Sequence, residues 1–377
     1  MRFIAVLILL ILFQFPLKSQ ERDTSRLSLL FAGDIMGHDE QIAGARDTIT
    51  GSYNYEPVFR FIKPVIEKSD IAIANLEVTL AGPPYKGYPQ FSSPDALVVA
   101  AKNAGFDVFI QANNHALDRG PQGFGRTISV LDSLNLLHTG TFSDSLDRLL
   151  HYPLILEKNN IRIAILNYTY GTNGLEIPKP FIINRIDTVQ IIQDLEKAKL
   201  ARPDFVIVTI HWGEEYERIE NPLQKKLAAF IFRNGAGAII GSHPHVVQPV
   251  DLTYNEDSTS VTSLVVYSLG NFVSNQRAQY KDGGIIFNLN LVKTISGTRI
   301  GNFSYIPSWV YREDLSGSSV FYIIPVSLYE NNNTLIKLKE YDQYKIDRFA
   351  EDTREQLKNI PELRVGTRDK GRGTGMK

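Results

Sequence analysis

The chain has 377 residues, of which 43% are hydrophobic and 21% charged, and this ordinary globular usage excludes a collagen-like, coiled-coil or wholly disordered protein. Its 40 basic and 41 acidic residues give a net charge of -1, which supplies no broad attraction for nucleic acid, so we expect no nucleic-acid partner. Because the cysteine count is 0, any metal must be held by His, Asp, Glu or Asn side chains.

Residues 1–20 have the pattern of an export signal. A basic Arg2 precedes the uninterrupted apolar run 3–13, and a polar exit follows Pro16. The small-residue cleavage rule is met only loosely, so an uncleaved segment that anchors the protein to the membrane is the alternative. The sequence therefore predicts an exported protein, either periplasmic or held at the membrane by its N-terminus.

From Leu27 onward, short apolar runs alternate with amphipathic stretches, which is the pattern of an α/β sheet. The expected strands and hairpin are 27–32, 71–74, 108–112, a hairpin over 155–164 with its turn at Asn159-Asn160, 205–210, 238–240, 264–267 and 284–289. The expected helices are 56–67, 94–104, 121–135, 187–200, 222–234 and 342–358. We expect one domain over 27–330, a C-terminal extension with a helix over 331–360, and a disordered basic tail over 361–377.

Five of the predicted strands end in polar residues that can bind metal. These ends are Gly33-Asp34, Asn75-Leu76-Glu77, Asn113-Asn114-His115, His211-Trp212-Gly213 and Gly241-Ser242-His243-Pro244-His245. Ligands of α/β sheets bind beyond the carboxyl ends of the strands, so these side chains are expected to converge on a shared site. A sulfur-free set this large exceeds what one tetrahedral ion needs and indicates one or two divalent ions.

Each of these residues also has a structural interpretation when it is taken singly. Asp34 could end a turn or cap a helix, Asn114 could serve a turn, and His211 could be a hydrogen-bonded core histidine. His138 and His151 do not lie in any of these strand-end motifs, and we interpret them as structural. His38 lies in the loop after Asp34, where a polar loop role is expected over ligation.

The motifs, taken together, resemble the poly-gamma-glutamate capsule biosynthesis proteins of the CapA type. The resemblance covers roughly residues 28–275 and rests on Gly33-Asp34-Ile35-Met36, Asn75-Leu76-Glu77, Asn113-Asn114-His115-Ala116-Leu117-Asp118, His211-Trp212-Gly213-Glu214-Glu215-Tyr216, Gly241-Ser242-His243-Pro244-His245-Val246 and Ser268-Leu269-Gly270-Asn271-Phe272. That family resembles the calcineurin-like metallophosphoesterases. The resemblance therefore implies a layered α/β sandwich in which two mixed β-sheets are flanked by helices.

The resemblance also implies roles for individual residues. The implied metal ligands, for one or two Mn, Fe or Zn ions, are Asp34, Glu77, Asn114, His211, His243 and His245. His115 and Asp118 would form a general-acid pair, although Asp118 could instead cap the next helix. Glu215, Tyr216 and Asn271 are the candidate substrate contacts. The wider phosphoesterase pattern has a further ligand at the position of Met36, so one metal position is short of a ligand.

The expected function is that of an exported, metal-dependent hydrolase linked to the synthesis or processing of poly-gamma-glutamate or another capsule polymer. Its substrate would be an anionic polymer, or a phosphoester or amide of the cell envelope, and the membrane machinery of polymer synthesis is a further partner. The first alternative is a non-catalytic accessory component of polymer synthesis or export that keeps a structural metal site. An extracellular binding protein is the remaining class.

Overall fold

The computed structural model describes residues 24–315, 317–331 and 336–366. The predicted export signal over 1–20 lies outside these residues. Among the described helices, none combines the length and the apolar character that crossing a membrane requires.

The larger of two main sheets has eight strands and begins with the N-terminal strand β1. Its strands follow the order β16-β15-β14-β1-β2-β3-β4, and β13 also pairs with β1. β1 runs parallel to β2 and antiparallel to β14, so the sheet is mixed. The strands are β1 (Ser25–Ile35), β2 (Ile71–Leu76), β3 (Val108–Ile110), β4 (Leu137–Thr139), β13 (Asn271–Val273), β14 (Gly283–Thr294), β15 (Gly297–Leu315) and β16 (Ser318–Pro325).

The second sheet has six strands in the order β11-β12-β10-β9-β7-β6. β7, β9, β10 and β12 are parallel, whereas β6 and β11 pair antiparallel at its two edges. Its strands are β6 (Leu154–Lys158), β7 (Ile161–Thr169), β9 (Phe205–His211), β10 (Ala238–Ser242), β11 (Val250–Tyr254) and β12 (Val261–Val266). A separate two-stranded sheet joins β5 (Thr141–Phe142) to β8 (Ile182–Ile183).

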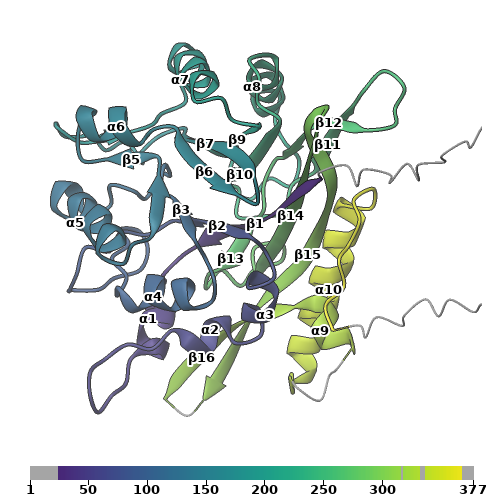
Figure 1. Cartoon of the computed structure of the whole chain (residues 1–377). Coiled ribbons are helices and arrows are strands. Elements are labelled where there is room, and N and C mark those ends of the chain that lie inside the picture. Colours follow the sequence, from purple (N-terminus) through teal and green to yellow (C-terminus); the bar gives the residue numbers. More distant parts are fainter. Residues whose placement is uncertain (1–23, 316, 332–335, 367–377) are drawn as a thin grey trace, which may run out of the picture.

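Helices cover the outer faces of both main sheets (Figure 1). Side chains of α2, α3 and α4 pack on one face of the first sheet, and those of α7 and α8 pack on the second. The helices are α1 (Asp39–Ala45), α2 (Glu56–Phe59), α3 (Lys63–Ile66), α4 (Ala96–Asn103), α5 (Gly120–Ser133), α6 (Ser145–His151), α7 (Thr188–Leu200), α8 (Pro222–Arg233), α9 (Val326–Asn331) and α10 (Glu340–Gln356). The predicted sandwich of two mixed sheets flanked by helices is confirmed.

The alternation of side chains along β1 shows how the layers are held together. Leu29 and Phe31 point into the core between the two sheets, and Leu30 and Ala32 point toward the helices. Both sets are buried, because a strand covered on both faces has no polar side. This explains why the strand appears in the sequence as a continuous apolar run.

Local sequence signals account for several of the boundaries. The predicted hairpin is confirmed: Asn159 and Asn160 join β6 to β7 with φ of 52° and 60°, a left-handed geometry that Asn tolerates. Asp187 accepts hydrogen bonds from the backbone N–H groups of Val189 and Gln190 and so caps α7.

The structure departs from the predicted elements in three places. The helix expected over 56–67 is two short helices, α2 and α3, and the second begins at Lys63-Pro64. The strand expected over 108–112 ends at Ile110. Residues 361–366, assigned to the tail, lie along β15, where the Tyr305 N–H donates to the Pro361 carbonyl at 2.9 Å; the rest of the tail lies outside the described residues.

The layer between the sheets should dominate the stability of the fold. Phe31 is 1% exposed there, so we expect Phe31→Ala to lower the free energy of unfolding by about 3–5 kcal/mol in chemical denaturation. The control Leu149→Ala, on a side chain that is 63% exposed, should change it by less than about 0.5 kcal/mol. Equal effects would contradict this arrangement of the core.

Candidate metal centre

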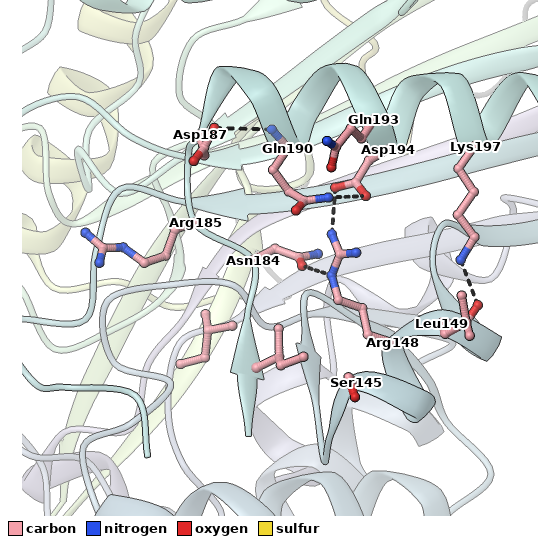
Figure 2. A pocket seen from close by; sticks show the side chains of 12 residues that line it. Ser145, Arg148, Leu149, Asn184, Arg185, Asp187, Gln190, Gln193, Asp194 and Lys197 are labelled. Carbon is pink, nitrogen blue, oxygen red and sulfur yellow. Dashed lines mark hydrogen bonds and ion pairs between the residues drawn. The ribbon is translucent and has the colours of Figure 1, made fainter. Parts of the chain in front are cut away.

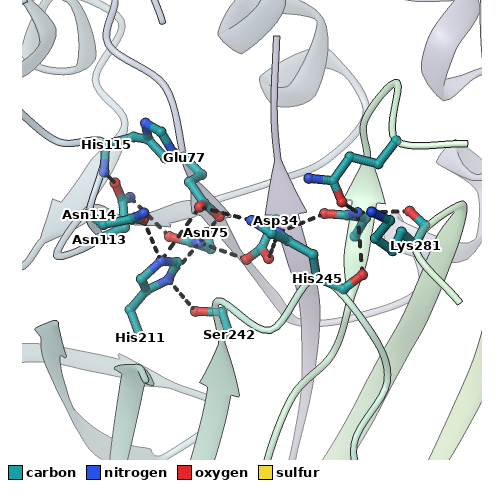
Figure 3. Close-up of polar contacts among 12 residues, drawn as sticks. Asp34, Asn75, Glu77, Asn113, Asn114, His115, His211, Ser242, His245 and Lys281 are labelled. Carbon is teal, nitrogen blue, oxygen red and sulfur yellow. Dashed lines mark hydrogen bonds and ion pairs between the residues drawn. The ribbon is translucent and has the colours of Figure 1, made fainter. Parts of the chain in front are cut away.

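The carboxyl ends of strands from both main sheets meet at one place (Figure 3). Asp34 lies near the end of β1, and its register partner on β2 is Asn75, two residues before Glu77. His211 ends β9 beside Ser242, which ends β10. The five predicted strand ends do not share a single sheet: β1, β2 and β3 belong to the first sheet and β9 and β10 to the second. The site therefore lies where the two sheets come together.

A close backbone approach sets the position of Asp34. The strand register shifts between Ala32 and Asp34, and the Asp34 N–H donates to the Gly270 carbonyl at 3.1 Å. A Cβ on Gly33 would lie 1.9 Å from that carbonyl oxygen. Only glycine fits at position 33, which gives the Gly-Asp pair its physical reason.

The Ser-His-Pro-His turn after β10 holds its histidines in an uncommon backbone conformation. His243 has φ of 98° and His245 has φ of 58°, a region that costs a non-glycine residue about 1–3 kcal/mol. The carbonyl of Pro244 accepts the Tyr216 N–H at 2.8 Å, which ties this turn to the loop after β9. Such local strain is typical of turns that position functional side chains.

Two groups of buried side chains could each hold a metal ion, and Glu77 belongs to both. One group is Asp34, Glu77 and His211, and the other is Glu77, His243 and His245; in each, the ligand atoms lie within 4.8 Å of one another. Glu77 Oε1 lies 3.5 Å from His211 Nε2 and 3.7 Å from His245 Nε2.

Two atoms of this cluster show that its residues fit a cation. Glu77 Oε1 and His243 Nδ1 are buried and have no hydrogen-bond partner. Leaving such an atom unsatisfied costs about 1–3 kcal/mol, and more for a charged group, unless a ligand satisfies it. Carboxylate and imidazole donors without sulfur suit Mn, Fe or Zn. The donor chemistry and the unsatisfied atoms therefore both indicate that these residues fit a divalent cation.

Amide and hydroxyl side chains orient these ligands. Asn75 Nδ2 donates to Asp34 Oδ1 at 2.8 Å and to Glu77 Oε2 at 3.1 Å. His211 Nδ1 lies 3.0 Å from Ser242 Oγ, and its Nε2 lies 2.8 Å from Asn114 Oδ1. The sequence analysis gave Asn75 no role, although it lies near the end of β2, two residues before Glu77, and this spacing along extended chain points both side chains to the same side.

The loop that carries Asn114 and His115 is held from behind by a chain of polar contacts. Asn167 Oδ1 accepts the Ala112 N–H at 2.7 Å, and Asn184 Nδ2 donates to the Asn167 carbonyl at 3.1 Å. Arg148 Nε donates to Asn184 Oδ1 at 2.7 Å inside a pocket of about 550 Å³ between α6 and α7 (Figure 2). Arg148 also pairs with Asp194 at 2.7 Å, so the side chains that line this pocket support the loop from outside the metal cluster.

The protonation of the cluster follows from its burial and charges. Burial alone raises the pKa of Asp34, but its hydrogen bond with His245 and the charge of that imidazole lower it to about 2. Burial lowers the pKa of His245, but attraction to Glu77 and the contact with Asp34 raise it to about 9. Burial raises the pKa of Glu77 well above its usual range, and repulsion from Asp34 adds to this.

The other two histidines are neutral at ordinary pH. Burial lowers the pKa of His211 to about 3, and burial together with neighbouring imidazoles lowers that of His243 to about 2. A neutral imidazole has a free lone pair, which is the form that ligates metal.

His115 and Asp118 form the predicted pair. His115 Nδ1 lies 2.7 Å from Asp118 Oδ2, and both side chains are buried. Asp118 Oδ2 also accepts the Phe91 N–H at 2.8 Å, and the N-cap of α5 is Arg119, so Asp118 does not cap that helix. Burial lowers the pKa of His115, but the hydrogen bond and charge of Asp118 outweigh this and raise it.

The three predicted substrate residues lie beside His245 and in the loop after β9. Asn271 Oδ1 lies 3.1 Å from His245 Nδ1, so Asn271 orients that imidazole. The Tyr216 ring centre is 6.2 Å from the His245 ring centre, and the side chain is 45% exposed. Glu215, the neighbour of Tyr216, contributes to raising the pKa of His245.

The remaining histidines have local partners. His38 is the N-cap residue of α1, and its Nδ1 lies 3.1 Å from Gln41 Oε1. His138 Nε2 lies 3.1 Å from Asp132, and His151 Nδ1 lies 2.7 Å from Asp147. The structural interpretation of these three histidines agrees with the geometry.

Sequence reasoning missed Tyr170, whose ring centre lies 4.5 Å from that of His243. Tyr170 follows the last residue of β7, which runs parallel to β9 and ends at the same edge of the sheet. Its position directly after a buried strand could have identified Tyr170 as a site residue. The sequence analysis identified the hairpin at the start of β7 but not the site residue after its end.

The chain is similar in sequence to one family of bacterial proteins. A family model described as "Bacterial capsule synthesis protein PGA_cap" matches residues 28–276. The capsule biosynthesis protein CapA of Bacillus anthracis is 30% identical over 279 residues, which is 71% of this chain and 64% of the relative. The PGA biosynthesis protein CapA of Bacillus subtilis (strain 168) is 30% identical over 262 residues, 66% of this chain and 64% of the relative. The chain thus spans less than two thirds of the length of these relatives.

Two solved structures are similar at a low level. A phosphatase from Mycoplasma pneumoniae has 16% identity and a TM-score of 0.45, and covers 75% of this chain and 94% of its own. A 5'-nucleotidase from Candida albicans SC5314 has 9% identity and a TM-score of 0.40, and covers 87% of this chain and 58% of its own. No conclusion about chemistry follows from likeness at this level.

The raised pKa of His245 predicts a pH effect on the metal-free protein. A histidine whose folded pKa lies above its unfolded value contributes stability below pH 6.5 that is lost as the pH rises through about 9. In chelator-treated protein, we therefore expect the stability difference between wild type and His245→Gln to narrow over this range by on the order of 3 kcal/mol. Urea unfolding at several pH values measures it, and a difference that stays constant would contradict the assignment.

Proposed function

This chain belongs to the PGA_cap family of bacterial capsule synthesis proteins, and from that premise we propose that it is a metal-dependent hydrolase of the cell envelope. The observation that carries the proposal is the buried His115–Asp118 pair next to a cluster with unsatisfied ligand atoms. A purely structural metal site needs no such pair.

The ligands proposed for one or two divalent ions are Asp34, Glu77, Asn114, His211, His243 and His245. Bound ions would supply Lewis acidity toward a phosphoryl or acyl group and would activate water. Asn75 Nδ2 bridges the two carboxylates by donating to both, and Ser242 and Asn271 fix the ring orientations of His211 and His245.

His115 is the proposed general acid. The hydrogen bond from its Nδ1 to Asp118 fixes the ring and leaves Nε2 for a leaving group. The negative charge of Glu77 contributes to the raised pKa of His115, so the two groups interact across the site. A histidine that keeps its proton near neutral pH can donate it to a departing alkoxide or amine.

The proposed substrate is an anionic polymer of the capsule, such as poly-gamma-glutamate, or a phosphoester or amide of the envelope. The names of the Bacillus relatives, which refer to capsule and PGA biosynthesis, support this choice. Export by residues 1–20 and contact with the membrane machinery of polymer synthesis belong to the same proposal.

One observation favours a non-catalytic accessory role as the second candidate. Met36, two residues after Asp34, is 1% exposed and offers no ligand oxygen. The cluster therefore lacks the ligand that the wider phosphoesterase pattern has at this position. A single ion held there could serve structure alone.

A pair of variants separates the two candidates. For His115→Ala we expect metal content and melting temperature near wild type but a kcat that is lower by roughly 10²–10⁴, because a positioned proton donor is lost. His243→Ala should lose metal instead. Metal analysis and assays on generic phosphoesters and γ-glutamyl peptides provide both readouts.

The leaving group gives the control for this experiment. An activated aryl phosphate needs no proton, so His115→Ala should affect it much less than a poor alkoxide or amine leaving group. If metal-replete wild type hydrolyses none of these substrates while His115→Ala still impairs polymer production in cells, the accessory role is the better account.

Export has its own test. Deletion of residues 1–20 should leave a folded protein in the cytoplasm, because β1 begins only at Ser25. Cell fractionation measures the distribution. Recovery of the deleted form in the envelope at the wild-type level would contradict the export signal.

A further inference from the structure

An unassigned cation lies at the edge of the metal centre. Lys281 Nζ is 3.8 Å from the centre of the Tyr216 ring, and that ring is 6.2 Å from the His245 ring. The ammonium therefore lies within about 10 Å of the His245 ring. Lys281 follows the residues 28–276 matched by the family model, so the family motifs assign it no role.

The backbone of Lys281 is fixed to the site. Asn271 Nδ2 donates to the Lys281 carbonyl at 2.8 Å, and Asn271 Oδ1 lies 3.1 Å from His245 Nδ1 (Figure 3). One amide side chain thus joins the lysine to a proposed metal ligand. A shift of the Lys281 backbone would therefore disturb Asn271, which orients that ligand.

The positive charge of Lys281 has no anionic partner in the described parts of the chain. Within residues 24–315, 317–331 and 336–366, its ammonium makes no ion pair or side-chain hydrogen bond, and it packs on the face of the Tyr216 ring. A cation on an aromatic face keeps most of its charge available. Lys281 is a partly exposed residue, so its ammonium can bind an anion that arrives from solvent.

Strained backbone marks the two loops that form this edge. Tyr216 has φ of 71° and Tyr280 has φ of 72°, a conformation that bulky residues avoid unless their surroundings impose it. The guanidinium of Arg218 lies 4.2 Å from the Tyr280 ring and joins the two loops. The surroundings thus hold both tyrosines where Lys281 meets Tyr216.

The C-terminal helix α10 supports both loops. The Asp352 carbonyl accepts from Arg218 Nη2 at 2.7 Å, and Asp352 Oδ2 accepts from Gln279 Nε2 at 2.8 Å. Lys345 Nζ lies 3.5 Å from Asp282 Oδ2, next to Lys281 in the chain. A helix beyond the family-matched residues therefore positions the edge of the site.

We propose that Lys281, seated on the ring of Tyr216, is a subsite for a second negatively charged group of the substrate, a carboxylate or a phosphate. The proposal rests on the proposed function of the neighbouring metal centre. It specifies the substrate class as a chain with at least two anionic groups, one at the metal centre and one at Lys281, and not a compact monoanion.

Three matched ligands test the subsite by calorimetric binding to the full chain loaded with Mn²⁺. They are octylphosphonate, 8-phosphonooctanoate and octane-1,8-diyl bisphosphonate, which share one phosphonate for the metal centre and differ in the second group. None can be hydrolysed, so the readout is affinity and not turnover. The carboxylate and bisphosphonate arms distinguish the two kinds of anion.

In wild type, we expect the second anionic group to tighten binding about 10-fold in at least one arm, as a hydrogen-bonded ion pair does. Lys281→Met should lower this gain to no more than about 2-fold. For the bisphosphonate, a factor of about 2 is the statistical advantage of its two equivalent ends. Lys281→Arg should retain it. Lys226→Met, which removes an exposed lysine on α8, should leave the gain unchanged.

The result that would overturn the subsite is a wild type that binds all three ligands equally, or a gain that survives in Lys281→Met. Melting temperatures of the variants check that each one is folded. Suppose metal-loaded wild type shows the Lys281-dependent gain but hydrolyses none of the phosphoester and γ-glutamyl substrates, while His115→Ala still impairs polymer production in cells. The subsite would then stand and the hydrolase proposal would fail. The two failures are therefore distinguishable.

Discussion

The site depends on a single carboxylate oxygen. Glu77 Oε1 is buried between His211 and His245 and has no hydrogen-bond partner. A buried carboxylate without compensation is unfavourable by several kcal/mol, so the surroundings must neutralise it with a proton or a cation. The orphaned nitrogen of His243 lies in the same cluster, and a proton on Glu77 would not satisfy it. A metal ion held by this cluster would give Glu77 Oε1 its missing partner, and His243 belongs to the same group of candidate ligands.

The fold makes this convergence possible by packing two sheets face to face, so that strand ends of both sheets meet at one edge. The apolar layer between the sheets, to which Phe31 and Ile207 belong, holds β1 against the second sheet. Asp34 and Glu77 then arrive from one sheet and His211 from the other. Helices on the outer faces leave the strand ends open, so the loops after the strands are free to carry polar side chains.

Strand ends were predictable because a buried strand appears as an apolar run, and the polar residue that follows it marks the edge of the sheet. Asp34, Glu77 and His211 were found in this way. Two sheets were expected from the family resemblance, but which strand belongs to which sheet could not be predicted, because apolar runs buried on both faces look alike in either sheet. Lys281 was also missed, since its role depends on contact with Tyr216, 65 positions earlier in the chain. Contacts between distant loops leave no periodic signal in the sequence.

The most direct test of the metal centre is anomalous X-ray diffraction from crystals grown with Mn²⁺, recorded for wild type and for Glu77→Gln. The account predicts an anomalous peak within bonding distance of Glu77 and at least one of His211, His243 and His245, and a peak that is lost or strongly reduced in the variant. Glu215→Gln, an acidic residue in the loop after β9, is the control and should keep the peak. Wild-type crystals without a peak, in which Glu77 and His243 bind water or each other, would contradict the account.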